Sequence, residues 1–239
     1  MTRELNSQCK TSLNGVLSKV IASTLTTAAL MSTTLMAQDI DVKITNNTNG
    51  IYFTPLLVSA HPSTTALFMS GDEASLNLKA MAEGGDVSGL VTDLDTVNAD
   101  SITNPAGGLL APGTSIMTTL STAVENTNLS IVAMMLPTND GFIGLNNWKV
   151  PTKAGTYTIN INAYDAGTEA NTELITDIPA DPGAYAGTGA TGMTATVEGY
   201  VHIHRGNIGD SDATAGKSDL NASAHRWLNP VATVIVTVK

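Results

Sequence analysis

The segment Asp165-Ala166-Gly167-Thr168-Glu169 has the composition of a cation-binding loop. Its two carboxylates lie four residues apart, and the glycine between them permits a tight turn. Calcium takes about six to eight oxygen ligands, often from loops that mix carboxylates with backbone carbonyls. Asp165 directly follows one predicted strand and Asp140 follows another, so the three acids could meet at one end of a sheet. The spacing alone leaves open a second interpretation, in which these acids only cap turns, as Asp commonly does.

His202 and His204 form a second candidate metal site. On a strand, side chains two residues apart share one face. Two imidazoles placed in this way could bind zinc or copper, together with a carboxylate from the following loop. The more common arrangement is a solvent-facing polar pair opposite buried Val201 and Ile203, and this is the interpretation that we favour. Whether the pair binds a second metal ion is left open by the sequence.

Motifs for catalysis are lacking. The sequence contains no G-x-S-x-G, no H-E-x-x-H and no phosphate-binding loop, and its only cysteine is Cys9. Asp165 and Glu169 could act as the paired acids of a glycoside hydrolase. Such an enzyme usually holds its sugar with aromatic residues, and these make up only 4% of the chain. We therefore expect a protein that is not an enzyme.

Strand signals dominate the sequence after residue 37. Apolar residues alternate with polar ones, or run together, in residues 40–44, 51–60, 128–136, 156–163, 196–204 and 231–238. Pro55, within the second stretch, indicates an edge strand or a bulge. Only residues 73–83 have helical spacing. The sequence therefore predicts an all-β fold, a single antiparallel β-sandwich with long end loops and at most a short helix.

The first 37 residues have the features of a signal peptide. Arg3, Lys10 and Lys19 give a basic start, residues 20–37 are uncharged and mostly apolar, and Ala37 is a small residue at the expected cleavage point. A membrane anchor is the alternative, but the stretch is short and rich in Thr, whereas a span needs about 20 largely apolar residues. We expect a signal peptide at 1–37 and a domain at 38–239, secreted to an extracellular or periplasmic location. We expect no stable membrane span after cleavage.

The predicted mature chain is strongly acidic. Three of the 11 basic residues but only one of the 21 acidic residues lie in the leader, which leaves a net charge of −12. Binding to phosphates requires a basic surface, so this charge argues against a nucleic-acid partner. Cys9 also lies in the leader, so the mature chain has no disulfide. Export without disulfides is more typical of a bacterial protein than of an animal ectodomain.

Four segments, in order, resemble the spondin N-terminal domain found in F-spondin, mindin and many bacterial exported proteins. They are residues 54–61 (TPLLVSAH), 71–85 (GDEASLNLKAMAEGG), 130–144 (SIVAMMLPTNDGFIG) and 165–169 (DAGTE). The third and fourth segments are the specific ones. Residues 224–231 (AHRWLNPV) are similar to the bacterial branch of the family. The resemblance spans roughly residues 39–239.

This resemblance implies an antiparallel β-sandwich with a calcium ion held between loops at one end. Matched residue by residue, the implied calcium ligands are Asp140, Asp165 and Glu169. The last position is often Asp in the animal proteins, and Glu keeps the charge while reaching one methylene further. The animal domains also have cysteines that this chain lacks, so their adhesion contacts do not carry over directly.

Two functional classes follow from the resemblance and the composition. In the first, the protein is an exported, calcium-binding adhesion or recognition module whose ligand is an extracellular protein or a glycan. In the second, it is a self-associating structural subunit of a cell-surface layer or an extracellular filament. The family favours the first class, and the sequence identifies neither the ligand nor the oligomeric state.

Overall fold

The computed structural model describes residues 37–182, 196–212 and 216–239, so the predicted signal peptide lies outside the described residues except for Ala37. Antiparallel strands make up most of the described chain. They are β1 (Gln38–Asn46), β2 (Tyr52–Phe53), β3 (Leu57–His61), β4 (Asp100–Thr103), β5 (Ser115–Thr122), β6 (Asn128–Leu136), β7 (Gly141–Lys149), β8 (Gly155–Asp165), β9 (His202–Ile203) and β10 (Ala232–Val238). Across the described ranges, no helix combines the length and apolar character that a membrane span requires.

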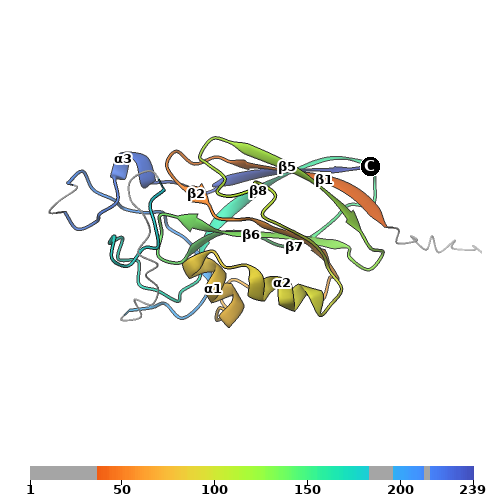
Figure 1. Ribbon diagram of the computed structural model, residues 1–239, viewed down its shortest axis with the longest axis horizontal. Coiled ribbons are helices and arrows are strands. Elements are labelled where there is room, and N and C mark those ends of the chain that lie inside the picture. The colour runs from red at the N-terminus through yellow and green to blue at the C-terminus, as the bar shows by residue number, and fades with distance from the viewer. Residues whose placement is uncertain (1–36, 183–195, 213–215) are drawn as a thin grey trace, which may run out of the picture. The chain divides into compact units, whose positions relative to one another are not determined.

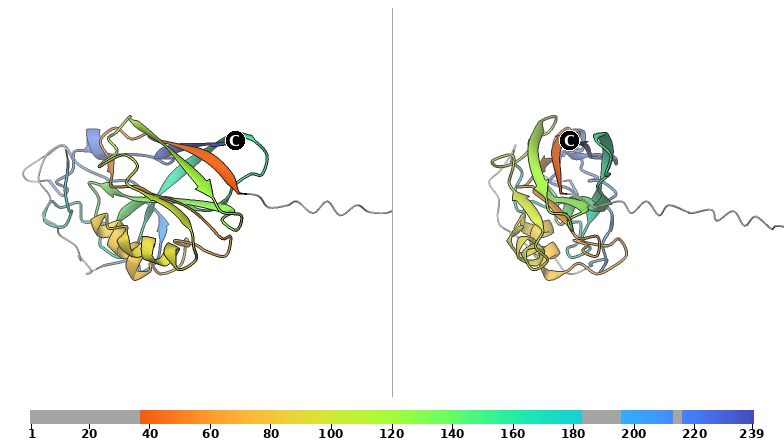
Figure 2. Two further views of the ribbon diagram at one scale, coloured as in Figure 1. Left: turned by 45° about the vertical axis from the view of Figure 1, so that its right-hand side comes forward. Right: turned by 90° about the vertical axis from the view of Figure 1, so that its right-hand side faces the viewer.

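The strand β8 takes part in both layers of the sandwich. Its residues 155–161 pair with β10, which pairs with β1, and β1 pairs with the edge strand β5. Its residues 162–164 and Asp165 pair with β7, and this second layer continues through β6 and β3 to the edge strand β4. In Figure 1, β1 and β5 lie in the upper layer and β6 and β7 in the lower one, and Figure 2 gives two further views of the layers. The architecture predicted from the sequence is therefore confirmed.

The period of two along the strands determines which side chains fill the space between the layers. Ile40, Val42 and Ile44 of β1 are fully buried, as are Val234 and Val236 of β10, and all five belong to one apolar cluster. The residues between them are partly buried or exposed, because successive side chains point to opposite faces of a sheet. The sequence alternates in residues 40–44 and 231–238 because each of these two strands buries only one of its faces.

β6 is buried along its whole length because both of its faces are covered. Leu129 and Ile131 pack into the cluster between the layers, whereas Val132 and Met134 pack into a second cluster on the other face of the sheet. This arrangement matches the continuous apolar run of residues 128–136, which alternation alone would not produce.

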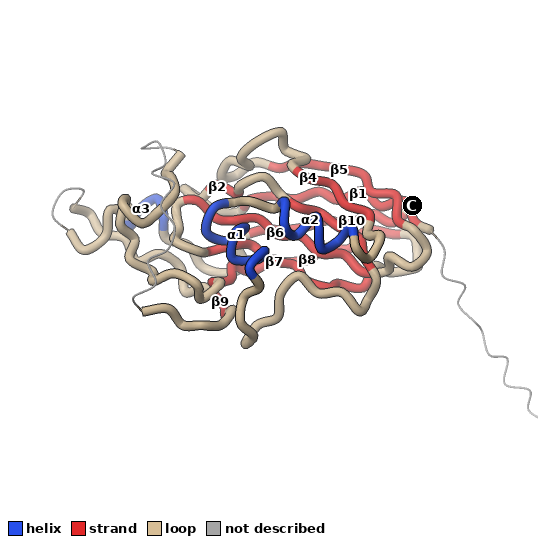
Figure 3. The backbone as a smooth tube through the Cα atoms, turned by 60° about the horizontal axis from the view of Figure 1, so that its bottom comes forward, coloured by secondary structure: helices blue, strands red, loops and turns tan. Residues whose placement is uncertain are grey.

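Two short helices cover the outer face of the lower layer. They are α1 (Leu76–Gly84) and α2 (Ser88–Asp95), and Figure 3 shows both lying across the strands of this layer. The hydroxyl of Ser75 accepts the N–H of Leu78 at 3.1 Å and caps α1, and Gly85 ends it in the left-handed conformation. α1 packs on β6 and β7 through Leu78 and Met81, and α2 packs on β3 through Leu90 and Leu94. The sequence indicated α1 but not α2, nor the single turn of α3 (Ala222–His225).

Two stretches differ from the strands that the sequence predicts. Residues 51–60 form two strands, β2 and β3, which both pair with β6, and one extra residue between Phe53 and Leu57 makes the bulge that Pro55 indicates. Residues 196–204 contain only the two-residue strand β9, so the prediction of a full strand there was wrong. Gly199 adopts a positive φ of 81°, and Val201 donates its N–H to the Asp72 carbonyl at 2.8 Å instead of to a neighbouring strand. The alternating pattern of residues 196–204 therefore occurs in a segment that is mostly a loop, which crosses the end of the sandwich.

Candidate metal centre

The candidate site lies where β7 and β8 meet at one end of the sandwich. Asp140 directly precedes β7, and Asp165 is the last residue of β8. Gly141 and Asp165 are register partners, so strand pairing alone brings the two aspartates together. The turn before β7 is held by Thr138, whose hydroxyl donates to the Met135 carbonyl at 2.6 Å and accepts the Gly141 N–H at 3.0 Å.

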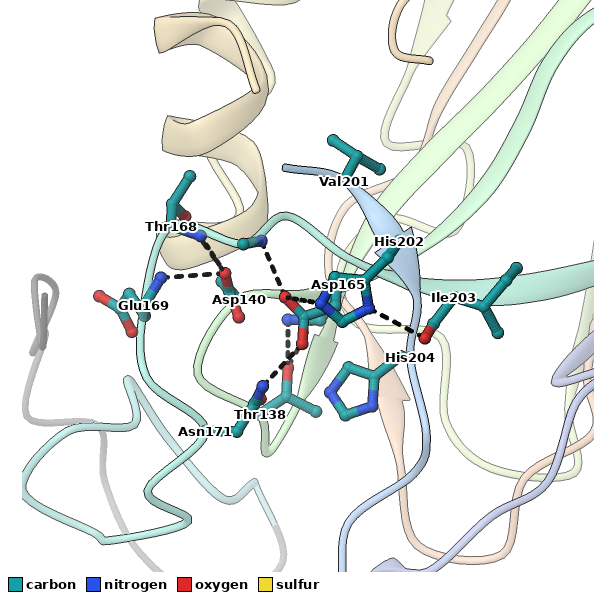
Figure 4. Close-up of polar contacts among 12 residues, drawn as sticks. Thr138, Asp140, Asp165, Thr168, Glu169, Asn171, Val201, His202, Ile203 and His204 are labelled. Atoms are coloured by element: carbon teal, nitrogen blue, oxygen red, sulfur yellow. Dashed lines mark hydrogen bonds and ion pairs between the residues drawn. The ribbon is translucent and has the colours of Figure 1, made fainter. Parts of the chain in front are cut away.

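The carboxylate of Asp140 is fully buried, and its two oxygens have different environments. Oδ2 accepts the backbone N–H groups of Thr168 at 2.7 Å and of Glu169 at 3.0 Å, as drawn in Figure 4. Oδ1 is also buried but has no hydrogen-bond partner among the described residues. A buried polar atom without a partner is costly, so the arrangement calls for a ligand at Oδ1.

Burial and a neighbouring negative charge raise the pKa of Asp140 to about 7. The larger cause is the loss of solvation, and the second is the charge of Asp165. The hydrogen bonds from Thr168 and Glu169 act in the opposite direction but are outweighed. Two aspartates thus lie close together in a site that penalises their shared negative charge. A bound cation would remove this penalty.

Asp165 is buried and connects the 166–171 loop to β9. Its Oδ1 accepts the Gly167 N–H at 2.8 Å, and its Oδ2 accepts the Asn171 side-chain amide at 2.7 Å. The Nε2 atom of His202 lies 3.6 Å from Oδ1. Within the described chain, no lysine or arginine forms an ion pair with Asp140 or Asp165.

A close backbone contact positions the segment that carries His202. Gly167 adopts a φ of 68°, and its carbonyl accepts the Gly199 N–H at 3.0 Å. A Cβ atom at Gly167 would collide with the backbone of Tyr200, so only glycine fits at this crossing. The loop after β8 and residues 198–202 therefore hold each other in place.

One group of three potential ligands is close enough for a single metal ion. Asp165, Glu198 and His202 each offer one ligand atom, and these atoms all lie within 4.8 Å of one another. Of the three acids predicted to bind calcium, this group contains Asp165 alone. Asp140 and Glu169 lie at the same end of the sandwich, with the Glu169 N–H bonded to Asp140 and the Glu169 side chain fully buried. The sequence did not mark Glu198 as a metal ligand. It could have been found, because Glu198 precedes His202 by four residues and belongs to the same period-two pattern.

His204 does not face solvent as the favoured interpretation of the histidine pair required. The His204 residue is only 5% exposed, whereas Ile203, expected to be buried, is 44% exposed. The Nδ1 atom of His204 accepts the Gly206 N–H at 3.0 Å, and burial lowers the pKa of His204 below the ordinary value. The ring packs against Trp227 with their centroids 4.9 Å apart. The expectation failed because, apart from the two residues of β9, residues 196–204 form a loop, in which the strand rule for faces does not hold.

A pocket of about 500 Å³ opens beside these residues. Asp165, Glu198, His202 and His204 all contribute to its lining, together with Tyr200, Arg205 and other residues of the same loops. The lining also contains Glu173, whose carboxylate accepts the N–H of Gly209 at 2.8 Å and the hydroxyl of Ser218 at 2.6 Å. The end loops thus line a partly open pocket beside the candidate ligands.

The fold and the site define an antiparallel β-sandwich whose end loops enclose buried acids. The chain belongs to the spondin N-terminal domain family, because the model of that family (Spondin_N) matches residues 43–185. The match includes Asp140, Asp165 and Glu169 and ends before Glu198 and His202. No individual curated protein matches the chain significantly.

Proposed function

We propose that this protein is an exported calcium-binding module that acts in extracellular adhesion or recognition, without catalytic activity. The observation that carries the calcium proposal is Asp140 Oδ1, a buried carboxylate oxygen that has no hydrogen-bond partner among the described residues and lies beside Asp165. Asp140 and Asp165 can both be ionised at neutral pH when a bound cation offsets their combined negative charge.

The chemistry of the donors favours calcium over other cations at Asp140, Asp165 and Glu169. All three are carboxylates, and the 165–169 loop adds backbone carbonyls, which are the hard oxygen ligands that calcium takes. The N–H groups of Thr168 and Glu169 fix Asp140 through Oδ2, so that Oδ1 can bind an ion without reorganisation. These residues fit a calcium ion.

A recognition role follows from where this ion would lie. It would tie the turn before β7 to the loop after β8, and the loop after β8 contributes Asn171 and Glu173 to the lining of the 500 Å³ pocket. Ordering the loops in advance reduces the entropy cost of binding a partner. We propose an extracellular protein or a glycan as the ligand.

Calcium should stabilise the protein after metal has been stripped from it with a chelator. Extracellular calcium modules bind at roughly 10⁻⁴–10⁻³ M, so millimolar calcium should add about 1 kcal/mol to the free energy of unfolding. The measurement is the melting temperature with and without calcium. The variants Asp165→Asn and Glu169→Gln should remove the shift. A wild-type melting temperature indifferent to calcium would refute the proposal.

The alternative, a structural subunit of a surface layer or filament, draws support from β5. Within the described chain this edge strand pairs with β1 alone, and Met117 on it is 66% exposed. An edge strand presents unpaired backbone groups to which a second copy can add. Size-exclusion chromatography with and without calcium separates the two functions: a discrete monomer or dimer supports recognition, and large assemblies support the structural role.

A further inference from the structure

We propose that Asp165, Glu198 and His202 form a second cation site, suited to a transition metal such as Zn²⁺, that opens into the 500 Å³ pocket. This inference goes beyond calcium binding, and it adds a different metal at a different set of ligands. The two sites share only Asp165.

The three ligands come from elements that the fold holds together. Asp165 ends β8, His202 is its register partner on β9, and Glu198 lies in the loop just before β9. The contact of Gly167 with Tyr200 fixes that loop against β8. The ligand atoms consequently lie within 4.8 Å of one another without any movement of the backbone.

The hydrogen bonding of His202 leaves one ring nitrogen ready to bind a metal. Its Nδ1 lies 3.1 Å from the Ile203 carbonyl, which can only accept, so Nδ1 carries the proton. In the neutral ring, Nε2 therefore presents a lone pair. A metal-binding histidine almost always donates its other N–H to a carbonyl or carboxylate in this way.

This lone pair faces a carboxylate, an arrangement that needs a positive charge between the two groups. The Nε2 atom is buried and has no hydrogen-bond partner among the described residues, and it lies 3.6 Å from Asp165 Oδ1. That distance is long for a hydrogen bond. Zinc bonds of about 2.0–2.2 Å in tetrahedral geometry would place two ligand atoms about 3.3–3.5 Å apart. The observed spacing is therefore close to that of two ligands of one zinc ion.

Imidazole together with carboxylates selects for zinc and against calcium, which takes oxygen ligands. Three protein ligands would leave the fourth tetrahedral position open toward the pocket. His204 lines the same pocket, and its Nδ1 already accepts the Gly206 N–H, so its Nε2 carries a proton. That Nε2 is buried and has no partner among the described residues. His204 thus brings an unused proton donor to the residues that line this pocket.

Zinc titration of the calcium-saturated protein tests this inference. Isothermal titration calorimetry should detect one zinc equivalent, and Co²⁺ in its place should give the visible absorption of a four-coordinate ion. His202→Ala and Glu198→Gln should weaken zinc binding by at least about tenfold. Neither should change the calcium-induced melting shift, because neither residue is a calcium ligand. The matched controls His225→Ala and Glu125→Gln change residues outside this group and should bind zinc like the wild type.

The outcomes separate this inference from the proposed function. Asp140→Asn should lose the calcium shift and keep zinc, whereas Asp165→Asn should lose both. If the wild-type protein binds zinc but shows no calcium-induced melting shift, only the proposed function is overturned. If the wild type takes up no zinc, or if His202→Ala and Glu198→Gln bind it as the controls do, His202 and Asp165 form only an ion pair and the inference is wrong.

Discussion

At the scale of single residues, the proposed calcium binding depends on how the two oxygens of Asp140 are used. Oδ2 accepts three hydrogen bonds, from Thr168 N, Thr168 Oγ1 and Glu169 N, whereas Oδ1 has no partner in the described chain. The residue thus holds a loop with one atom and offers the other to a cation. A substitution that keeps the hydrogen bonds of Oδ2 but removes the negative charge separates the structural role from the proposed cation binding.

Asp140→Asn is that substitution. Its amide oxygen can replace Oδ2, so the fold should persist, but the site loses a negative ligand for a hard cation. We expect the stabilisation of about 1 kcal/mol by millimolar calcium to disappear. The melting temperature with calcium and with chelator measures it. The exposed Asp95→Asn should retain the full shift, and an unchanged shift in Asp140→Asn would remove Asp140 from the ligand set.

Asp140 should also make the stability of the calcium-free protein depend on pH. Its pKa is about 7 in the folded protein and 3.8 ordinarily, so the folded state binds the proton more tightly. The resulting stability is fully present below pH 3.8 and is lost as the pH rises through about 7. Relative to Asp140→Asn, the wild type should therefore lose stability between pH 5 and 7, by at most about 1.4 kcal/mol per pH unit. Denaturant unfolding of both proteins measures this, and parallel pH profiles would contradict it.

At the scale of elements, the site depends on the crossing of the loop after β8 with residues 198–202. Both candidate metal sites take Asp165 from one side of this crossing, and the proposed zinc site takes two ligands from the other side. Besides the short pairing of β9 with β8, the crossing is held by backbone contacts at Gly167, so a single methyl group there should disturb it.

Gly167→Ala should destabilise the protein by about 2 kcal/mol or more, because a Cβ there is strained at positive φ and meets the Tyr200 backbone. It should also weaken zinc binding, since Glu198 and His202 would move away from Asp165. Gly113→Ala is the matched control: its φ is 70° against 68°, and no atom lies within 4 Å of its added Cβ. Equal effects of the two variants on zinc binding would show that the crossing does not position the site.

At the scale of the whole molecule, the first strand begins where the predicted leader ends. Gln38 is the first residue of β1 and pairs with Thr122, and its side-chain amide donates to the Pro151 carbonyl at 3.1 Å. Cleavage after Ala37 would leave β1 complete. We therefore expect the exported protein to begin near Gln38, which N-terminal sequencing would establish. Exported protein that begins at Met1 would contradict this expectation.

Much of the fold is determined by the sequence itself. The alternation in 40–44, 156–163 and 231–238 and the apolar run in 128–136 correspond to β1, β8, β10 and β6, since a buried strand face imposes a period of two and two covered faces impose a continuous run. The family was likewise recognisable from local segments, and its model matches residues 43–185. Asp140 and Asp165 could be singled out because each follows such a strand.

Only the tertiary structure decided what residues 196–204 do. Their period-two pattern predicts a strand, but the contacts with Gly167 and Asp72 hold them as a loop across the end of the sandwich. Those contacts join residues more than 30 positions apart, and no local pattern encodes them. They bury His204, expose Ile203 and bring Glu198 and His202 to Asp165. The sequence supplied the acids and the histidines, and the packing of distant loops determined which of them lie close enough to share a cation.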